Sequence, residues 1–161
     1  MLLWFAALSV VIVWAVFQSP ALDYRLVALG AAAPVAELAA GRPLVLHTLA
    51  GAVGALALVM AATRRRRLLR RRLLGVPIGL FLHLVLDGVW ADRDLFWWPA
   101  FGFDFAAREL PETSRGLLNL GLEVIGAGVL VWGWRRFGLA QPEARRALLR
   151  SGRLDDGRRA R

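Results

Sequence analysis

The sequence predicts an all-α integral membrane protein, a helical bundle with about five membrane segments, and three observations lead to this fold class. The 161 residues are 58% hydrophobic, so their apolar surface exceeds what one small core could bury. Several apolar runs are long enough, or nearly long enough, to cross a bilayer. Arginines fill positions 64–67 and 70–72 between two of these runs. Because short basic loops stay in the cytoplasm, this arginine block places the neighbouring helix ends at the inner face.

The charge and the absence of cysteine limit the partners and the chemistry. The net charge of +9 would suggest nucleic acid for a soluble protein. Here the arginines gather at the ends of apolar runs and in the tail, so we expect no nucleic acid and instead membrane lipids with anionic headgroups. The chain has no cysteine, so any metal would have to be bound by His, Asp and Glu side chains.

The first three membrane segments precede the arginine block. Residues 2–17 form an apolar run that we interpret as a retained helix, because no positive start marks it as a signal peptide. Residues 26–40 contain Pro34 and Glu37 and fall short of the ~20 residues that a full crossing needs. This second segment is therefore either a short, kinked crossing or a re-entrant segment. Residues 43–62 form an uninterrupted apolar run that ends at the block.

Two further segments follow the block. In residues 73–90 we expect Pro77 to bend the inner half of the helix. The loop over residues 91–115 is rich in aromatic side chains, which favour the headgroup level on the outer face. Residues 116–134 form the last crossing, and the two arginines after it place the C terminus in the cytoplasm. We thus expect a bundle over residues 1–137 and a basic cytoplasmic tail over residues 138–161, solvated or lying on the headgroups.

Five ionisable side chains lie inside these apolar runs. An acid or imidazole at mid-bilayer costs roughly 2.5–3.5 kcal/mol, so each is expected to face the bundle interior and to have a partner. Counting about 1.5 Å per residue from the outer helix ends places all of them in the outer third of the membrane. The five residues are Glu37, His47, His83, Asp87 and Glu123.

Their types and spacing fit a metal site. His83 and Asp87 are four residues apart and share a helix face, so they can bind a metal together, or the Asp can orient the imidazole. Adding His47 and one of Glu37 or Glu123 gives a nitrogen and oxygen set suited to Zn, Mn or Fe(II). The alternative is a buried polar cluster that holds the bundle together without chemistry.

Two stretches resemble a known family. Residues 83–99, a His-x-x-x-Asp followed by an aromatic loop that ends in Trp-Trp-Pro, are similar to the signature of the bacterial membrane-bound metal-dependent hydrolases, also described as LexA-binding, inner-membrane-associated hydrolases. Residues 42–48, with His47 before Thr48, resemble a second element of that family. With the helices around them, the resemblance covers roughly residues 20–136. The sequence departs from the family at Val35, where the family carries an Asp, while Glu37 matches a later acid.

The resemblance implies a multi-pass hydrolase of the bacterial inner membrane that depends on one divalent metal, Zn, Mn or Fe. His47, His83 and Asp87 would be ligands, Glu37 a fourth ligand, and Glu123 a further ligand or the general base. A lipid or lipid-linked ester would fit a site at this depth. The rival interpretation is a non-enzymatic membrane protein whose polar cluster is structural and whose arginine-rich inner face binds anionic lipid or a partner. A proton-coupled transporter is disfavoured because the sequence shows no repeated halves.

Overall fold

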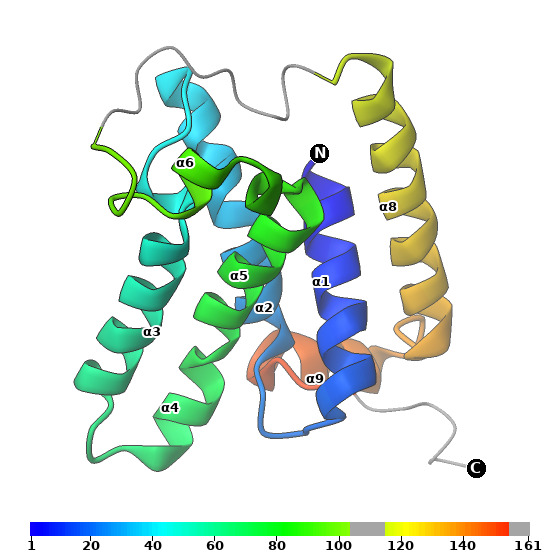
Figure 1. The fold of residues 1–161 in the computed structure, drawn as a ribbon. Coiled ribbons are helices and arrows are strands. Elements are labelled where there is room, and N and C mark those ends of the chain that lie inside the picture. The colour runs from blue at the N-terminus through cyan, green and yellow to red at the C-terminus, as the bar shows by residue number, and fades with distance from the viewer. Residues whose placement is uncertain (104–114, 155–161) are drawn as a thin grey trace.

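The computed structural model describes residues 1–103 and 115–154, and within them the protein is all-helical. Helix α5 lies at the centre, packed against α2, α3 and α1, and α1 also packs against α8. Figure 1 shows α1, α3, α5 and α8 running between two ends of a bundle, with α6 at one end and α4 and α9 at the other. The bounds of these helices are α1 Leu2–Phe17, α2 Tyr24–Ala32, α3 Leu49–Ala62, α4 Arg67–Leu73, α5 Gly75–Asp87, α6 Arg93–Phe96, α8 Leu117–Arg136 and α9 Pro142–Ser151.

The second predicted segment is short and changes helix type. Asp23 begins α2 by accepting a hydrogen bond from the backbone N–H of Arg25. After Ala32 the chain continues as the 3₁₀ helix η1 (Ala33–Ala40), which contains Pro34. Proline removes a backbone donor and clashes with the preceding turn, so the α-helical hydrogen-bond pattern cannot continue unchanged there. The second segment is therefore short in the described structure, and its helix type changes next to Pro34.

The third predicted segment begins as a helix later than its apolar run does. Residues 45–47 form the 3₁₀ helix η2 (Val45–His47), and α3 starts only at Leu49. Thr48 caps α3, because its side chain accepts a hydrogen bond of 3.0 Å from the N–H of Gly51. The first part of this apolar run therefore forms η2, which places His47 beside α5, and does not extend α3.

The fourth predicted segment is interrupted near the arginine block. Helix α4 ends at Leu73, Leu74 is a turn, and α5 begins at Gly75. Pro77 lacks an N–H, and its ring opposes the carbonyl group four residues earlier, that of Leu73. The bend predicted from Pro77 therefore takes the form of a break one turn before it. A short 3₁₀ helix, η3 (Val89–Ala91), joins α5 to α6.

Helices α2 and α5 approach each other closely enough to need glycine. A Cβ atom added to Gly79 would lie 2.1 Å from the carbonyl oxygen of Val27, and one added to Gly30 would lie 2.1 Å from that of Val76. No side chain larger than hydrogen fits at these distances without moving backbone. This contact holds the His83 turn of α5 against α2.

The chain after α8 folds back onto the bundle. Leu139 and Leu154 are buried in one apolar cluster with Tyr24, Val27 and Phe137. The backbone N–H of Tyr24 also donates a 2.9 Å hydrogen bond to the carbonyl oxygen of Gly152. The interpretation of residues 138–161 as a solvated tail is thus wrong for the part up to Leu154, and residues 155–161 lie outside the described structure.

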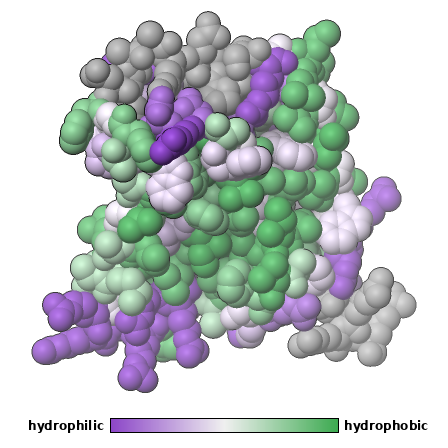
Figure 2. Space-filling model, in the orientation of Figure 1, coloured by the Kyte–Doolittle hydropathy of each residue, from purple (hydrophilic) through white to green (hydrophobic). Residues whose placement is uncertain are grey.

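Helix length supports one membrane crossing, which corrects the prediction of about five membrane segments. Within the described residues, α8 alone is both long and apolar enough to cross a bilayer, while α1 and α3 are apolar but shorter. Figure 2 shows a broad hydrophobic band across one face, with hydrophilic residues gathered toward its two ends. The connection from α3 to α4, which carries part of the arginine block, and the basic end of α8 lie at the same end of the bundle (Figure 1).

Candidate metal centre

Three of the five predicted side chains meet in the interior. His47 ends η2, and His83 and Asp87 lie on one face of α5. Each offers a potential metal-ligand atom, and these atoms all lie within 4.8 Å of one another. All three residues are completely buried. The group lies toward the C-terminal end of α5, the end of the bundle away from α4 (Figure 1).

Glu37 orients the His47 ring from behind. Its Oε2 lies 2.6 Å from Nδ1 of His47, and because a carboxylate accepts, this nitrogen carries the proton. The same carboxylate accepts hydrogen bonds from the backbone N–H groups of Leu44, at 2.7 Å, and Leu46, at 2.8 Å. Nε2 is then the nitrogen that His47 can offer to a metal ion. A carboxylate–histidine pair of this kind is typical of metal sites.

A backbone carbonyl group orients His83 in the same way. Nδ1 of His83 lies 2.7 Å from the carbonyl oxygen of Ala31 on α2. Since a carbonyl oxygen only accepts, Nδ1 again carries the proton and Nε2 is the nitrogen available as a ligand. The ring is also packed against Phe5, with 4.0 Å between centroids, and it meets the His47 ring edge-on at 5.2 Å. Contacts from three helices therefore fix its position.

Asp87 has one oxygen paired and one available. Oδ1 accepts a 2.8 Å hydrogen bond from Nη1 of Arg115, whose guanidinium also contacts the backbone carbonyl group of Asp87. Oδ2 is buried and has no hydrogen-bond partner among the residues that the structure describes. A buried carboxylate oxygen without a partner is costly, and a metal ion would satisfy it.

The residues present fit a divalent transition metal. Two imidazole nitrogens and one carboxylate oxygen form the set that Zn and Fe(II) bind, and three protein ligands leave a position open, as catalytic sites require. Among the described residues the fixed charges near the group balance, because the carboxylates of Glu37 and Asp87 face the guanidinium of Arg115 and the N-terminal amino group.

The two predicted glutamates do not join the group of three. Glu37 is hydrogen-bonded to Nδ1 of His47 instead of lying among the potential ligand atoms, and both of its carboxylate oxygens accept hydrogen bonds. Glu123, on α8, accepts hydrogen bonds from the backbone N–H groups of Leu3 and Trp4. It thereby caps the first turn of α1, where free N–H groups and the helix dipole favour a negative charge.

Three residues that contact the site were not predicted from the sequence. Ala31 contributes only its carbonyl oxygen and Phe5 only its ring, so no motif could reveal them. Arg115 carried a usable signal, because it is a cation at the outer start of the last apolar run and Asp87 needs a counterion at the same depth.

Comparison with known protein families, curated proteins and solved structures gave no match. The resemblance to the membrane-bound metal-dependent hydrolases therefore depends on the residues alone.

Proposed function

We propose that this protein is an integral membrane, metal-dependent hydrolase whose site opens toward the outer leaflet. The convergence of His47, His83 and Asp87, with potential ligand atoms within 4.8 Å of one another, carries the proposal. The orientation of both imidazoles by acceptors outside the group, Glu37 and the carbonyl group of Ala31, supports it further.

The surface supports a multi-pass placement in the bacterial inner membrane. Nine large apolar side chains of α8 are exposed, and α3 exposes Val53, Leu56, Leu58 and Met60. Exposed apolar area on several helices at once is unusual for a soluble protein and ordinary against lipid. With the arginine block inside, the C terminus is cytoplasmic and α6 lies at the outer face (Figure 1).

The side chains would divide the chemistry among them. A divalent metal supplies Lewis acidity and lowers the pKa of water towards ~7, so that a strong protein base is not needed. His47, His83 and Asp87 would hold the metal, and Glu37 would keep the His47 ring in the binding tautomer. Arg115 pairs with Asp87 while 26% of its side chain is exposed, so it can also receive an anionic group of the substrate. A lipid or lipid-linked ester at the outer leaflet is the substrate class that fits.

A structural role is the second candidate function, and it is supported by the hydrogen bonds that join separate segments. The bond from His83 to Ala31 ties α5 to α2, and the bonds of Glu37 tie η1 to η2. A polar clamp would use the same contacts without a metal. The metal content of the protein separates the two.

The experiment measures bound metal after growth with added Zn, Mn and Fe and purification in a mild detergent. We expect about one tightly bound ion per chain, lost in His83→Ala and in Asp87→Ala. Glu123→Gln is the matched control, because Glu123 is a partly buried acid outside the group of three. Hydrolysis of a fluorogenic lipid ester in mixed micelles should follow the metal content and stop with a chelator. A folded wild-type protein without metal would overturn the proposal.

A further inference from the structure

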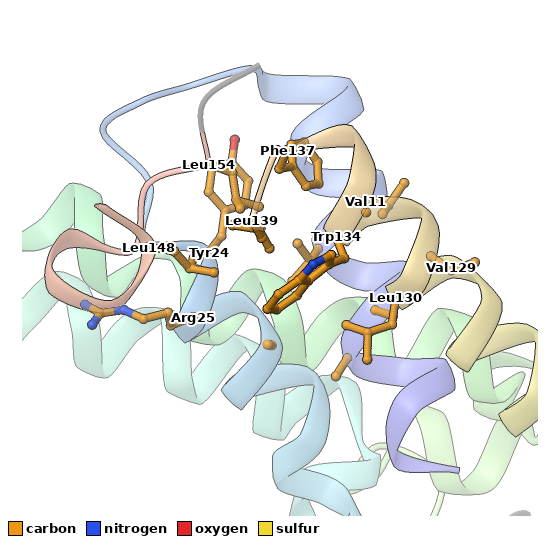
Figure 3. A pocket seen from close by; sticks show the side chains of 15 residues that line it. Val11, Tyr24, Arg25, Val129, Leu130, Trp134, Phe137, Leu139, Leu148 and Leu154 are labelled. Carbon is orange, nitrogen blue, oxygen red and sulfur yellow. The ribbon is translucent and has the colours of Figure 1, made fainter. Parts of the chain in front are cut away.

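A cavity lies at the end of the bundle away from the candidate metal centre. It has a volume of about 320 Å³, is open on one side, and is lined by α1, α2, α8 and the chain around α9. Ala7, Val10, Leu130 and Trp134 are among the side chains of its wall, and nearly all of its surface is apolar. Figure 3 shows Leu130, Trp134, Leu139 and Leu148 among the apolar side chains that line it. The volume is within the range of small-molecule and cofactor sites.

The charge at its edge is positive. Among the described residues, Arg25 is the one charged residue that lines the cavity, and Figure 3 shows it at the edge, extending toward α9. Its guanidinium pairs with Asp23 at 2.7 Å and also donates to the carbonyl group of Leu149, yet 41% of the side chain stays exposed. The adjoining chain over residues 138–154 adds further cations, which outnumber its single acid, Glu143, and are exposed. They are Arg145, Arg146, Arg150 and Arg153.

An apolar cavity beside a basic surface matches a molecule with an apolar tail and an anionic head. The neighbouring α8 exposes apolar side chains along its length and ends in Arg135 and Arg136. This is the order in which an inner-leaflet phospholipid presents its acyl chain and its phosphate. A soluble anion would leave the cavity unused, and a neutral lipid would leave the arginines without a ligand.

We propose that this cavity binds one acyl chain of an anionic phospholipid of the inner leaflet, with its phosphate held by Arg25 and the arginines of α9. The site depends on the membrane placement proposed above but not on the metal centre. Binding here would hold α9 against α1, α2 and α8, because Leu148 and Leu154 form part of the cavity wall.

Two substitutions on α8 test the cavity. A Cβ added to Gly133 would meet only the Phe137 ring, at 3.6 Å, so Gly133→Leu can place its side chain in the cavity without moving backbone. Gly128→Leu is the control, because a Cβ there meets nothing within 4 Å and the residue does not line the cavity. Both variants exchange glycine for the same helix-forming residue, so their effects on helix propensity should match.

The measurement is lipid retention and titration by native mass spectrometry of the full chain in mild detergent. We expect one dioleoylphosphatidylglycerol per wild-type chain, bound at least about tenfold more tightly than dioleoylphosphatidylcholine because each nearby arginine attracts anionic lipid. Gly133→Leu should lose this lipid and Gly128→Leu should keep it. The triple variant Arg145→Gln, Arg146→Gln, Arg150→Gln should lose most of the preference for phosphatidylglycerol.

Three results would overturn the site: equal binding of the two lipids by the wild type, equal binding by the two glycine variants, or an unchanged preference in the triple variant. A lipid-free dimer would assign the cavity to a second copy of the chain and would overturn it too. Metal content, measured on the same samples, should stay at the wild-type level in Gly133→Leu. Loss of lipid with retained metal, or the reverse in His83→Ala, therefore tells the two proposals apart.

Discussion

At the scale of single residues, Glu37 decides how tightly His47 could hold a metal. Its carboxylate is 7% exposed and joins the His47 ring to the backbone of residues 44–46. We predict that Glu37→Ala lowers metal affinity about 10- to 100-fold, because the ring loses the acceptor that fixes its tautomer and direction. Competition with a fluorescent chelator measures this affinity.

The coordination shell distinguishes an orienting acid from a ligand. If Glu37 acts through His47, X-ray absorption at the metal edge should show the same protein ligands in the wild type and in Glu37→Ala. Glu143→Gln, at an exposed acid of α9, serves as the control and should bind metal normally. Loss of an oxygen ligand in Glu37→Ala would show that Glu37 coordinates the metal directly, as the family resemblance implies.

Sequence spacing predicted the residues on one helix better than those on separate segments. The interval between His83 and Asp87 fixes them on one face of α5, and the depth count correctly brought His47 to the same level. The same count also placed Glu37 and Glu123 at this level, but depth gives no direction around a helix axis. Glu123 faces the start of α1, and Glu37 is taken by N–H groups of a turn whose geometry no spacing rule encodes.

At the scale of elements, the approach of α2 to α5 holds the candidate site together. A methyl group at Gly79 would lie 2.1 Å from the carbonyl oxygen of Val27, and His83 sits one turn further along α5. We predict that Gly79→Ala destabilises the protein by about 1–3 kcal/mol, the usual cost of overpacking. The midpoint of unfolding by sodium dodecyl sulfate in mixed micelles measures this loss.

Gly54→Ala on α3 is the control for Gly79→Ala, since a Cβ at Gly54 meets nothing within 4 Å. It should leave the midpoint unchanged or raise it, because alanine favours helix by about 1 kcal/mol over glycine. Metal affinity should fall only in Gly79→Ala, through the displaced bond from His83 to Ala31. Equal midpoints for the two variants would mean that α2 and α5 can separate without cost.

The glycines also show which feature of helix packing the sequence does not predict. Small residues in apolar runs, such as Gly54, Gly79, Gly121 and Gly126, are all candidates for close packing against another helix. Gly79 and Gly126 meet backbone at close range, whereas Gly54 and Gly121 meet nothing. Composition identifies glycines that allow close approach, but which of them meet a neighbour depends on how each helix is rotated in the bundle.

The arginine-rich C-terminal region is a second segment whose packing the sequence did not predict. Its charge suggested a solvated tail, yet Tyr24 and Arg25 hold it to the start of α2 by donating hydrogen bonds to the carbonyl groups of Gly152 and Leu149. Burial raises the pKa of Asp23, but the hydrogen bonds and charge of Arg25 outweigh burial and leave that pKa below its ordinary value. The carboxylate therefore stays ionised at neutral pH. Leucines of this region pack on the bundle, although its four arginines suggested a solvated segment.

At the scale of the whole molecule, the two ends of the bundle differ in a way that gives it a direction. One end carries the arginine block and α9, and the other carries α6 and the candidate metal centre (Figure 1). The arginines predict that the first of these ends lies in the cytoplasm, because basic loops resist translocation. The sequence predicted the number of crossings less well, because within the described residues α8 alone is long and apolar enough to cross. Helix α1 spans its whole apolar run but has only 16 residues, and α3 begins later than its run does.

Cysteine labelling can test this direction directly, because the natural sequence contains no cysteine. We introduce Ala100→Cys at the α6 end, and Arg65→Cys and Arg146→Cys at the basic end, all at exposed positions. In spheroplasts, a membrane-impermeant maleimide should label Ala100→Cys at once and should label the other two only after permeabilisation. The physical reason is that neither the reagent nor a cluster of guanidinium groups crosses the hydrocarbon core unaided. Each variant, labelled after solubilisation, serves as its own control for reactivity.

The reversed pattern would place the candidate metal centre on the cytoplasmic side, so that its substrate would come from the inner leaflet. Labelling of all three sites in intact spheroplasts would contradict a transmembrane arrangement altogether, and the exposed apolar side chains of α3 and α8 would then require a protein partner instead of lipid.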